Sequence, residues 1–217
     1  MPITLFTVSE IFKSIQGEST FAGLPCVFIR FTGCNLRCRY CDTTYAYTEG
    51  FTIKADDLIF RVKEMGPQLV ELTGGEPLLQ DGIGELTTSL LQQGLMVIVE
   101  TNGTVPIRVL DPGAIVIMDV KTPGSGHSID KNLIDNLENL KSCDEVKFVV
   151  TDQRDYKWSK TFIEKYDLIE RCNVLISPAF GIVEPQKLAA WILEDNLPVR
   201  LNLQLHKYIW SPEQRGV

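Results

Sequence analysis

The most informative stretch of the sequence is residues 34–41, Cys34-Asn35-Leu36-Arg37-Cys38-Arg39-Tyr40-Cys41, which places three thiols in a C-x3-C-x2-C spacing. Iron–sulfur clusters are held by Cys thiolates, and a four-iron cluster usually takes four of them. The spacing therefore predicts one 4Fe-4S cluster with three Cys ligands, Cys34, Cys38 and Cys41. One iron of that cluster stays open if no distant Cys completes the set.

Two other interpretations of the three thiols are weaker. A structural zinc ion needs a fourth Cys or His close by, usually in a second paired motif. The remaining candidates are scattered along the chain: Cys26, Cys143, Cys172, His127 and His206. Three buried structural Cys fit poorly, because the residues between the thiols are polar. We expect the three isolated Cys to be buried as small apolar side chains.

The composition indicates a globular protein that does not bind nucleic acid directly. Of the 217 residues, 44% are hydrophobic and 23% are charged, and the formal net charge is −7. No basic tract is available to neutralise phosphates. Residues 1–15 lack the pattern of a signal peptide, and no apolar run approaches the roughly 18 residues that a membrane span needs. Six Cys without a secretory signal favour metal ligation in a reducing compartment, so we expect a cytoplasmic protein without a membrane partner.

Predicted strands and helices alternate along the chain after an apolar-polar segment at residues 8–15. The predicted strands are residues 26–31, 68–73, 96–100, 114–118, 145–150, 174–176 and 199–203. The predicted helices are residues 55–65, 83–93, 133–140, 156–166 and 185–193. No repeat or linker interrupts this pattern. We therefore expect a single α/β domain over residues 1–217, with a parallel sheet.

Polar and glycine-rich clusters follow the predicted strands. Right-handed crossovers put the carboxyl ends of parallel strands on one rim, where the active sites of barrel and open α/β folds lie. The clusters are Cys34/Cys38/Cys41, residues 74–77, residues 100–103, residues 119–121, Ser177-Pro178 and Gln204/His206. Their common position predicts one site at this rim.

The three-Cys motif, with aromatic Tyr40 before its last Cys, is similar to the signature of the radical S-adenosylmethionine (SAM) superfamily. The resemblance implies an incomplete (partial) β/α barrel of the TIM type. It also implies that SAM binds the open iron and is cleaved to a 5′-deoxyadenosyl radical. The cofactors then carry the radical step, while the protein supplies position and excludes water.

The same resemblance implies which residues bind SAM. Gly74-Gly75-Glu76-Pro77 is similar to the superfamily's glycine-rich motif, where missing Cβ atoms let the backbone approach a ligand. The implied set is Tyr40, Gly74, Gly75, Glu76, Glu100, Thr101, Asn102, Asp119, Lys121 and Ser177. Plain turns are the alternative for residues 74–77 and 100–103. A salt bridge to Asp119 is an equal alternative for Lys121.

A narrower resemblance involves both ends of the chain. Gln16-Gly17-Glu18-Ser19, Phe28-Ile29-Arg30, G-C-N-L-x-C-x-Y-C-D-T from residue 33, and Gln204-Leu205-His206-Lys207 resemble the 7-carboxy-7-deazaguanine synthase family. The resemblance implies a homodimeric carbon–nitrogen lyase of queuosine and 7-deazapurine biosynthesis, a tRNA modification pathway. That lyase converts 6-carboxy-5,6,7,8-tetrahydropterin to 7-carboxy-7-deazaguanine and releases ammonia. SAM is then a regenerated cofactor, and a flavodoxin- or ferredoxin-type protein donates the electron.

The family resemblance also implies a substrate site. Its residues are Gln16, Gly17, Glu18, Arg30, Thr73, Gly75, Gln204 and His206. Arg offers a planar fork that matches the pterin carboxylate. Thr43 is implied to bind Mg²⁺, a cation that prefers oxygen ligands and leaves positions for substrate. No residue is assigned as acid or base, and Ser19 stands where many relatives carry Gly.

Two alternatives remain open at this point. A small radical SAM activase of a glycyl-radical enzyme shares the Cys spacing but has no need for Gln16, Glu18, Arg30 and His206. A non-enzymatic iron–sulfur module predicts a fourth Cys ligand. Taken alone, Arg30 fits a cross-strand ion pair and His206 fits a satisfied core or surface histidine.

Overall fold

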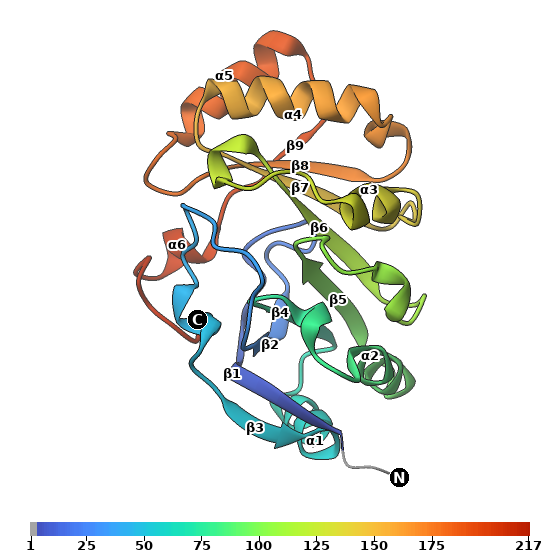
Figure 1. The fold of residues 1–217 in the computed structure, drawn as a ribbon. Coiled ribbons are helices and arrows are strands. Elements are labelled where there is room, and N and C mark those ends of the chain that lie inside the picture. The colour runs from blue at the N-terminus through green and yellow to red at the C-terminus, as the bar shows by residue number, and fades with distance from the viewer. Residues whose placement is uncertain (1–3) are drawn as a thin grey trace.

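The computed structural model describes residues 4–217. Within that range, nine strands form one sheet in the order β3-β1-β2-β4-β5-β6-β7-β8-β9. The sheet curves into an incomplete barrel, with helices on its outside (Figure 1). This arrangement confirms the predicted partial β/α barrel. That residues 1–217 form a single domain stays a prediction.

The strands are β1 Leu5–Ile15, β2 Pro25–Phe31, β3 Phe51–Lys54, β4 Leu69–Gly74, β5 Met96–Thr101, β6 Ile115–Lys121, β7 Glu145–Val150, β8 Asn173–Pro178 and β9 Arg200–Leu201. The α-helices are α1 Ala55–Met65, α2 Ile83–Gln92, α3 Lys131–Leu137, α4 Gln153–Lys165, α5 Pro185–Asp195 and α6 His206–Ile209. Strands β2 and β4 to β9 pair in parallel, as predicted.

The prediction of an all-parallel sheet is wrong at its first edge. β1 pairs antiparallel with both β2 and β3, and neither β1 nor β3 was predicted as a strand. β3 has only four residues, too few for a clear alternation of apolar and polar side chains. Ile15 of β1 lies beside Pro25, at the amino end of β2. The segment that follows β1 therefore begins at the end of the barrel where the parallel strands start. The three thiols lie at the other end, just after β2 finishes.

Capping residues and a glycine mark one end each of α1, α3 and α4. The Asp152 side chain accepts hydrogen bonds from the backbone of Arg154 and Asp155 and so caps α4, and Asp130 caps α3 through Asn132. Gly66 ends α1 with a φ of 94°, a conformation that glycine adopts without strain. The predicted helix boundaries agree with these limits to within about one turn.

The two faces of the sheet differ sharply. Alternate side chains of the parallel strands point outward and pack against α1 to α5 in one hydrophobic core. These are Val27, Ile29, Phe31, Val70, Leu72, Val97, Val99, Val116, Met118, Val120, Val146, Phe148, Val150, Val174 and Ile176. Strands of a parallel sheet are covered in this way because crossover helices lie on the sheet's face.

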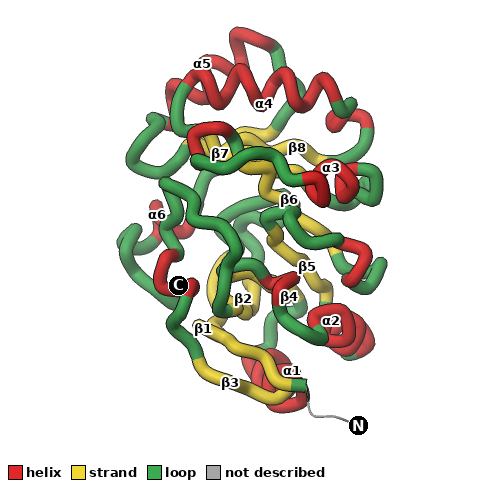
Figure 2. The backbone as a smooth tube through the Cα atoms, in the orientation of Figure 1, coloured by secondary structure: helices red, strands yellow, loops and turns green. Residues whose placement is uncertain are grey.

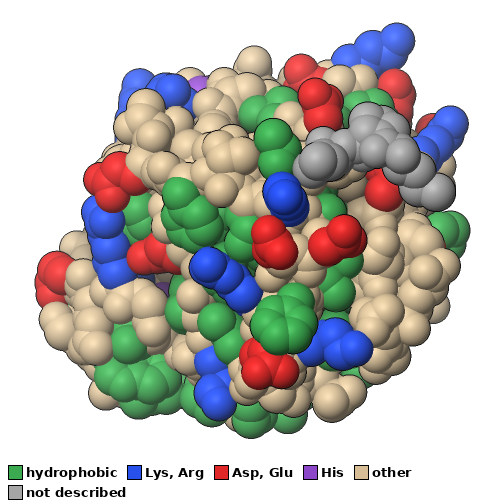
Figure 3. Space-filling view, turned by 90° about the horizontal axis from the view of Figure 1, so that it is seen from below, with side chains coloured by type: hydrophobic (Ala, Val, Ile, Leu, Met, Phe, Trp, Pro, Cys, Tyr) green, Lys and Arg blue, Asp and Glu red, His purple; other side chains and the backbone are tan. Residues whose placement is uncertain are grey.

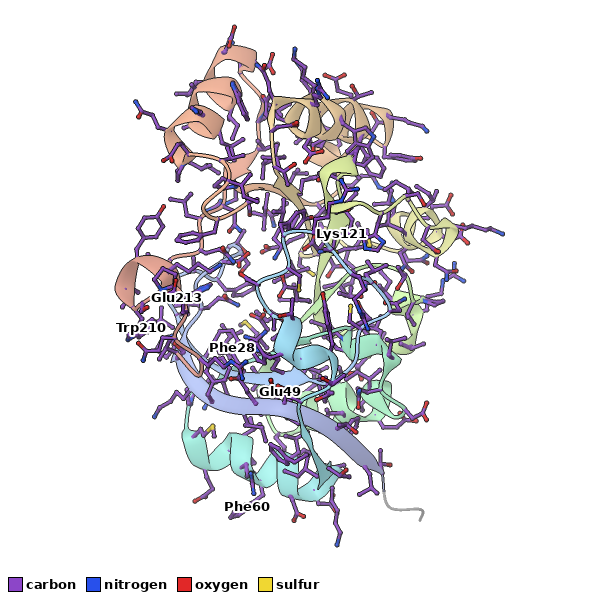
Figure 4. All side chains as sticks on the ribbon, turned by 60° about the vertical axis from the view of Figure 1, so that its left-hand side comes forward. Phe28, Glu49, Phe60, Lys121, Trp210 and Glu213 are labelled. Atoms are coloured by element: carbon purple, nitrogen blue, oxygen red, sulfur yellow. The ribbon has the colours of Figure 1, made fainter. Side chains whose placement is uncertain are left out.

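The inner face carries an apolar cluster near the amino ends of the strands. There Cys26, Phe28, Leu69, Ile98 and Ile117 form a small second cluster, with Phe21 packed against it. Towards the carboxyl ends, the inward positions carry charged and polar side chains. In Figure 4, Phe28 and Lys121 lie inside the fold, whereas Phe60 projects outward from α1.

Several expectations need correction. β6 extends to Lys121, so Asp119 and Lys121 lie within a strand instead of after it. The last predicted strand, residues 199–203, is reduced to Arg200–Leu201, and His206 begins the short helix α6. Cys26 and Cys172 are buried as expected, but Cys143 is exposed.

The outer surface is mixed in charge. Seen from below, the described Lys and Arg side chains are interspersed with Asp, Glu and hydrophobic side chains (Figure 3). None of the helices over residues 4–217 is both long and apolar enough to cross a membrane.

Candidate active site

A cavity of about 660 Å³ occupies the inside of the barrel. The carboxyl halves of the strands form its floor, and the loops after β2 and β8 and the segment 204–217 surround it. In Figure 2, green loops and α6 cover the side that the strands leave open. Of the residues predicted to bind a cluster, SAM, Mg²⁺ or substrate, all but Glu76 line this cavity.

The cluster loop, residues 34–41, is tied to its neighbours by backbone and side-chain hydrogen bonds. The Arg37 backbone N–H donates to His127 Nε2 at 3.0 Å, and the Arg39 N–H donates to the Ser125 carbonyl at 3.1 Å. At its start, Asn35 Nδ2 donates to Thr104 Oγ1 at 2.7 Å. These contacts attach the loop to the segments that follow β5 and β6.

Cys34, Cys38 and Cys41 are free thiols that all border the cavity. Burial raises the pKa of Cys34 and Cys38. Within residues 4–217, no three Cys, His, Asp or Glu side chains converge closely enough to hold a single metal ion. Each thiolate of a four-iron cluster binds a different iron, so its ligands surround a volume instead of meeting at a point. The donor set therefore fits a three-Cys cluster better than a zinc ion.

None of the three isolated Cys is available as a fourth ligand. Cys26 is buried at the amino end of β2, Cys172 is buried before β8, and Cys143 is exposed before β7. None of them lines the cavity. This geometry leaves the non-enzymatic module without the extra ligand that it requires.

Gly74 and Gly75 allow the end of β4 to lie directly against the strand and loop that carry the thiols. A Cβ at Gly75 would collide with the Gly33 carbonyl, and one at Gly74 would collide with the Phe31 backbone. The N–H of Gly75 donates to the Phe31 carbonyl at 3.1 Å, and the N–H of Glu76 donates to the Gly33 carbonyl at 2.8 Å. The two glycines are thus needed for chain packing.

Glu76 does not border the cavity. Its carboxylate is fully buried and accepts hydrogen bonds from the Asn102 N–H at 2.7 Å, from Thr101 Oγ1 at 2.8 Å and from the Leu78 N–H at 3.1 Å. Each oxygen of the Glu76 carboxylate therefore accepts at least one hydrogen bond from the chain. The side chain therefore joins the loop after β4 to the loop after β5, and both loops are hydrogen-bonded to the cluster loop or its start, at Asn35 and Gly33.

Two buried polar atoms in the cavity have no hydrogen-bond partner within the described part of the chain: the Tyr40 hydroxyl and Asp119 Oδ1. The other Asp119 oxygen accepts from Lys121 Nζ at 2.6 Å, so the predicted salt-bridge alternative for Lys121 is realised. Buried polar groups are almost always paired. Two unpaired atoms beside the cluster loop are what a polar ligand such as SAM would satisfy.

Residues 16–21, which we call the bridging segment, connect the two ends of the open barrel. The Ser19 N–H donates to Asn202 Oδ1 at 2.8 Å, and the Leu205 N–H donates to the Gly17 carbonyl at 2.8 Å. The Gly17 position needs a glycine because a Cβ would collide with His206. Ser19 has a φ of 65°, in the region that favours glycine, so a Gly would fit this position without strain.

Lys147, from the middle of β7, is the centre of a buried charge network. Its ammonium contacts Glu100, lies 3.0 Å from Glu18 Oε2 and lies 3.9 Å from Asp119 Oδ2. Glu100 also accepts from Thr73 Oγ1 at 2.9 Å. Despite burial, Lys147 and these hydrogen bonds lower the pKa of Glu100 to about 2. The carboxylates raise the pKa of Lys147, so the lysine stays charged.

Sequence reasoning missed Lys147 and Glu71, which both line the cavity. Both have apolar neighbours on either side, Val70 and Leu72 in β4 and Val146 and Phe148 in β7, although β4 also contains Thr73 and β7 begins with Glu145. A parallel strand covered on both faces reads as a continuous apolar run. A single charged residue inside such a run is the signal that could have identified them.

Arg30 and His206 both line the cavity. Arg30 Nε donates to Glu10 Oε2 at 3.0 Å, and Glu10 also accepts from Tyr45 Oη at 3.0 Å. Arg30 thus makes the cross-strand ion pair and lines the cavity as well. Burial lowers the pKa of His206, which keeps this imidazole neutral at neutral pH.

The segment 206–217 is fastened over the cavity by charged contacts. Lys207 Nζ contacts Asp42 Oδ2, while Arg215 Nη1 lies 2.8 Å from Glu49 Oε2 and its guanidinium stacks over Tyr45 at 3.5 Å. In Figure 4, Trp210 and Glu213 lie on this segment, on the same side as Phe28 and Glu49. Thr43, which also lines the cavity, donates to Asp42 Oδ1 at 2.9 Å.

Comparisons with known proteins agree with this site. Residues 28–122 match the family model described as the radical SAM superfamily. The chain is 46% identical over 213 residues to a 7-carboxy-7-deazaguanine synthase of Chlorobaculum tepidum, covering 97% of this chain and 96% of the relative. It is 41% identical to the synthase of the same description in Koribacter versatilis, covering 97% and 99%. The crystal structure of QueE from Escherichia coli has the same fold, with a TM-score of 0.77, 23% identity, and coverage of 93% and 95%.

Proposed function

The chain belongs to the 7-carboxy-7-deazaguanine synthase family of radical SAM enzymes, and we propose that its cavity converts 6-carboxy-5,6,7,8-tetrahydropterin to 7-carboxy-7-deazaguanine with release of ammonia. One observation carries this proposal. The three cluster thiols border the same cavity as Gln16, Glu18, Arg30 and His206, although these groups come from distant parts of the chain.

The enzyme uses one 4Fe-4S cluster and SAM. Cys34, Cys38 and Cys41 would hold the cluster, and its fourth iron would be left for SAM. When bound, the cluster and SAM would together supply the radical chemistry of the reaction. The residues of this chain then have three tasks: to orient SAM, to hold the pterin beside it, and to exclude water.

SAM is oriented by polar groups at the carboxyl ends of β4 to β8. Tyr40 Oη and Asp119 Oδ1 are unpaired among residues 4–217 and are free to bond SAM. Gly74 and Gly75 offer backbone, and Thr101, Asn102, Lys121 and Ser177 line the same side of the cavity. Glu76 acts through Thr101 and Asn102, whose positions its carboxylate sets.

The pterin lies against the bridging segment and Arg30. Arg30 binds the pterin carboxylate, because its guanidinium keeps donors beyond the one that bonds Glu10. Glu18 accepts hydrogen bonds from ring N–H groups, and neutral His206 and Gln204 close the pocket from the opposite end of the barrel. Thr73, Gly75 and Glu100 form the boundary between the pterin and SAM.

A magnesium ion is part of this proposal. The Thr43 hydroxyl borders the cavity two residues after Cys41, where an ion bound to it would also reach the pterin carboxylate. Mg²⁺ keeps several waters and often has few protein ligands, so one hydroxyl with substrate oxygens is chemically adequate. Removal of Mg²⁺ by a chelator should raise the KM for the pterin, and Thr43→Val should give the same rise in the presence of Mg²⁺.

Two partners complete the proposal: a second copy of the chain in a homodimer, and a flavodoxin- or ferredoxin-type electron donor. The support for both is membership of the family. Sedimentation velocity of the reconstituted protein measures the first. Turnover with each reduced donor, compared with a chemical reductant, measures the second.

Turnover of the reconstituted protein tests the function. Protein loaded anaerobically with iron and sulfide is mixed with SAM, Mg²⁺, a reductant and 6-carboxytetrahydropterin, and the product is followed by absorbance and mass. The proposal predicts 7-carboxy-7-deazaguanine from the wild type and none from Cys38→Ala. Equal turnover by Cys38→Ala, or no product from the loaded wild type, would contradict it.

A further inference from the structure

Glu71 is a buried carboxyl group in the floor of the cavity to which the chemistry above assigns no task. It lies in the middle of β4, is 5% exposed, and borders the cavity. Its neighbours in register on the adjacent strands are the apolar Phe28 and Ile98. A carboxyl group in such a position requires a specific partner.

The partner is Gln16 of the bridging segment. Gln16 Nε2 donates to Glu71 Oε2, and Gln16 Oε1 accepts from the Glu18 N–H at 3.0 Å. The Gln16 amide therefore connects Glu71 on the floor to the backbone of Glu18. The Glu18 carboxylate in turn bonds Lys147 at 3.0 Å and Gln204 at 3.0 Å. Glu71 thus lies at one end of a chain of contacts that sets where Glu18 points.

Charged groups and one neutral thiol face Glu71 from the elements packed against it. They are Glu100 from β5, Glu18 from the bridging segment, Lys147 from β7, and Arg30 with the Cys26 thiol from β2. Lys147 already pairs with Glu100 and Glu18, and Arg30 with Glu10. Burial, followed by repulsion from Glu100 and Glu18, raises the pKa of Glu71 well above its usual range.

We propose that Glu71 is a positioning residue that works as an un-ionised acid. It holds the Gln16 amide, and through it Glu18, in the position that the pterin requires, without adding a third negative charge beside Lys147. This inference rests on the proposed function only in treating Glu18 as a substrate ligand. Ionisation of Glu71 would repel Glu18 and Glu100 and draw Lys147 away from them.

The kinetic test compares two substitutions in the reconstituted enzyme. Glu71→Gln keeps a neutral hydrogen-bonding group, so kcat/KM should stay within about threefold of the wild type. Glu71→Leu removes the acceptor of Gln16, and we expect the KM for the pterin to rise about tenfold with little change in kcat, since an unpaired buried donor costs roughly that much. If Glu71→Gln is as poor as Glu71→Leu, Glu71 acts as a carboxylate and the proposal fails. It also fails if Glu71→Leu behaves as the wild type.

The pH dependence separates positioning from mere packing. As the pH is raised, the wild type should lose kcat/KM on the alkaline side when Glu71 ionises, and Glu71→Gln should lose less. Glu145→Gln is the matched control, because Glu145 is a second buried carboxyl that bonds the bridging segment through Thr20 but lies outside the cavity. Its profile should follow that of the wild type. An alkaline limb unchanged in Glu71→Gln would overturn the proposal.

Coupling to Gln16 is the third readout. If Glu71 acts through Gln16, Glu71→Leu should raise KM by less than about twofold in a Gln16→Leu background. Full additivity of the two effects would contradict the proposal.

Melting temperatures give a readout that needs no turnover. The advantage of Glu71→Gln over the wild type should grow with pH, because a raised folded pKa removes stability as pH rises above the unfolded value. A constant difference would show that Glu71 is ionised when folded. If the wild type shows no turnover, the proposed function fails. The melting temperatures then decide by themselves whether Glu71 is ionised in the folded protein.

Discussion

Lys147 and Phe148 are neighbours on β7, yet they belong to opposite faces of the sheet. The Phe148 ring packs edge-on against Trp158 and Phe162 of α4, in the core between sheet and helices. The Lys147 ammonium points inward to Glu18, Glu100 and Asp119. The same alternation holds along β2 and β4 to β8. Apolar packing on the outer face stabilises the fold. The buried charges of the inner face, which are arranged for a ligand, reduce that stability.

The largest effect should come from removing the centre of the inner network. Lys147→Met leaves Glu18 and Glu100 without their common cation, while Asp119 keeps Lys121; loss of one partner of a buried ion pair typically costs about 3–5 kcal/mol of stability. Because Glu18 and Glu100 lose their common partner, we expect kcat/KM to fall by more than about 100-fold. Chemical denaturation and steady-state turnover measure the two effects.

Phe148→Leu is the matched control on the outer face. It should cost about 1–2 kcal/mol through imperfect filling of the core. Its kcat/KM should stay close to that of the wild type when assayed well below its melting temperature. A similar loss of turnover in both variants would break the distinction between the two faces.

The next effect concerns the contact between β4 and the cluster loop. In Gly75→Ala, the new Cβ would displace the Gly33 carbonyl and with it the start of the loop. A displacement of about 1 Å beside reacting groups can lower turnover roughly 100-fold. We expect a decrease of about 10- to 100-fold, together with a lower iron content after reconstitution.

Gly94→Ala supplies the control for that substitution. Gly94, unlike Gly75, has a positive φ, 79°, but nothing lies within 4 Å of its added Cβ. It should cost stability without lowering iron content. Equal iron content in Gly75→Ala and the wild type would show that the close approach is not needed for the cluster.

A smaller effect appears in the acid stability of the protein without its cofactors. The pKa of Glu100 is lowered to about 2 by its contact with Lys147 and its hydrogen bonds. A lowered folded pKa gives stability that is present above the unfolded value, near 4.3, and is lost as pH falls towards about 2. Glu100→Gln should therefore be less stable than the wild type near pH 6, with the difference shrinking as pH falls. Melting temperatures at several pH values measure it, and a pH-independent difference would contradict the ion pair.

The smallest effect should come from Ser19→Gly. Glycine relieves the positive φ at this position, which is worth about 1–2 kcal/mol for a residue with a Cβ. The substitution also removes the Ser19 Oγ that accepts from the Phe21 N–H at 3.1 Å. We expect a gain of no more than about 1 kcal/mol and unchanged KM. A large rise in KM would show that the serine hydroxyl has a role in the site.

Sequence alone predicted the outer face far better than the inner one. Apolar residues such as Val97 and Val99 in β5 indicate a strand, whichever face of the sheet they occupy. The helices that cover the outer face were predicted from the helical spacing of apolar residues and from the residues that end helices. β1 was harder, because its partly exposed residues lack a regular alternation. The thiols and glycines were found because they form local motifs.

The inner network depends on contacts between distant residues. Glu71 is 55 positions from Gln16, and Lys147 is 129 positions from Glu18. No local pattern encodes such pairs, so Glu71 and Lys147 were missed. The assignment of Glu76 to SAM stays a prediction, and in the structure its carboxylate accepts three hydrogen bonds from the chain itself. The resemblance supplied the other predicted site residues, and in the fold the bridging segment lies at the same cavity as the three thiols.

The most direct test of the central claim is the EPR spectrum of the reduced, reconstituted protein with and without SAM. The inner face should hold a 4Fe-4S cluster with one iron open to SAM, so the account predicts a reduced-cluster signal that shifts when SAM is added. A reduced cluster whose signal is indifferent to SAM, or a protein that takes up zinc instead of iron, would contradict it.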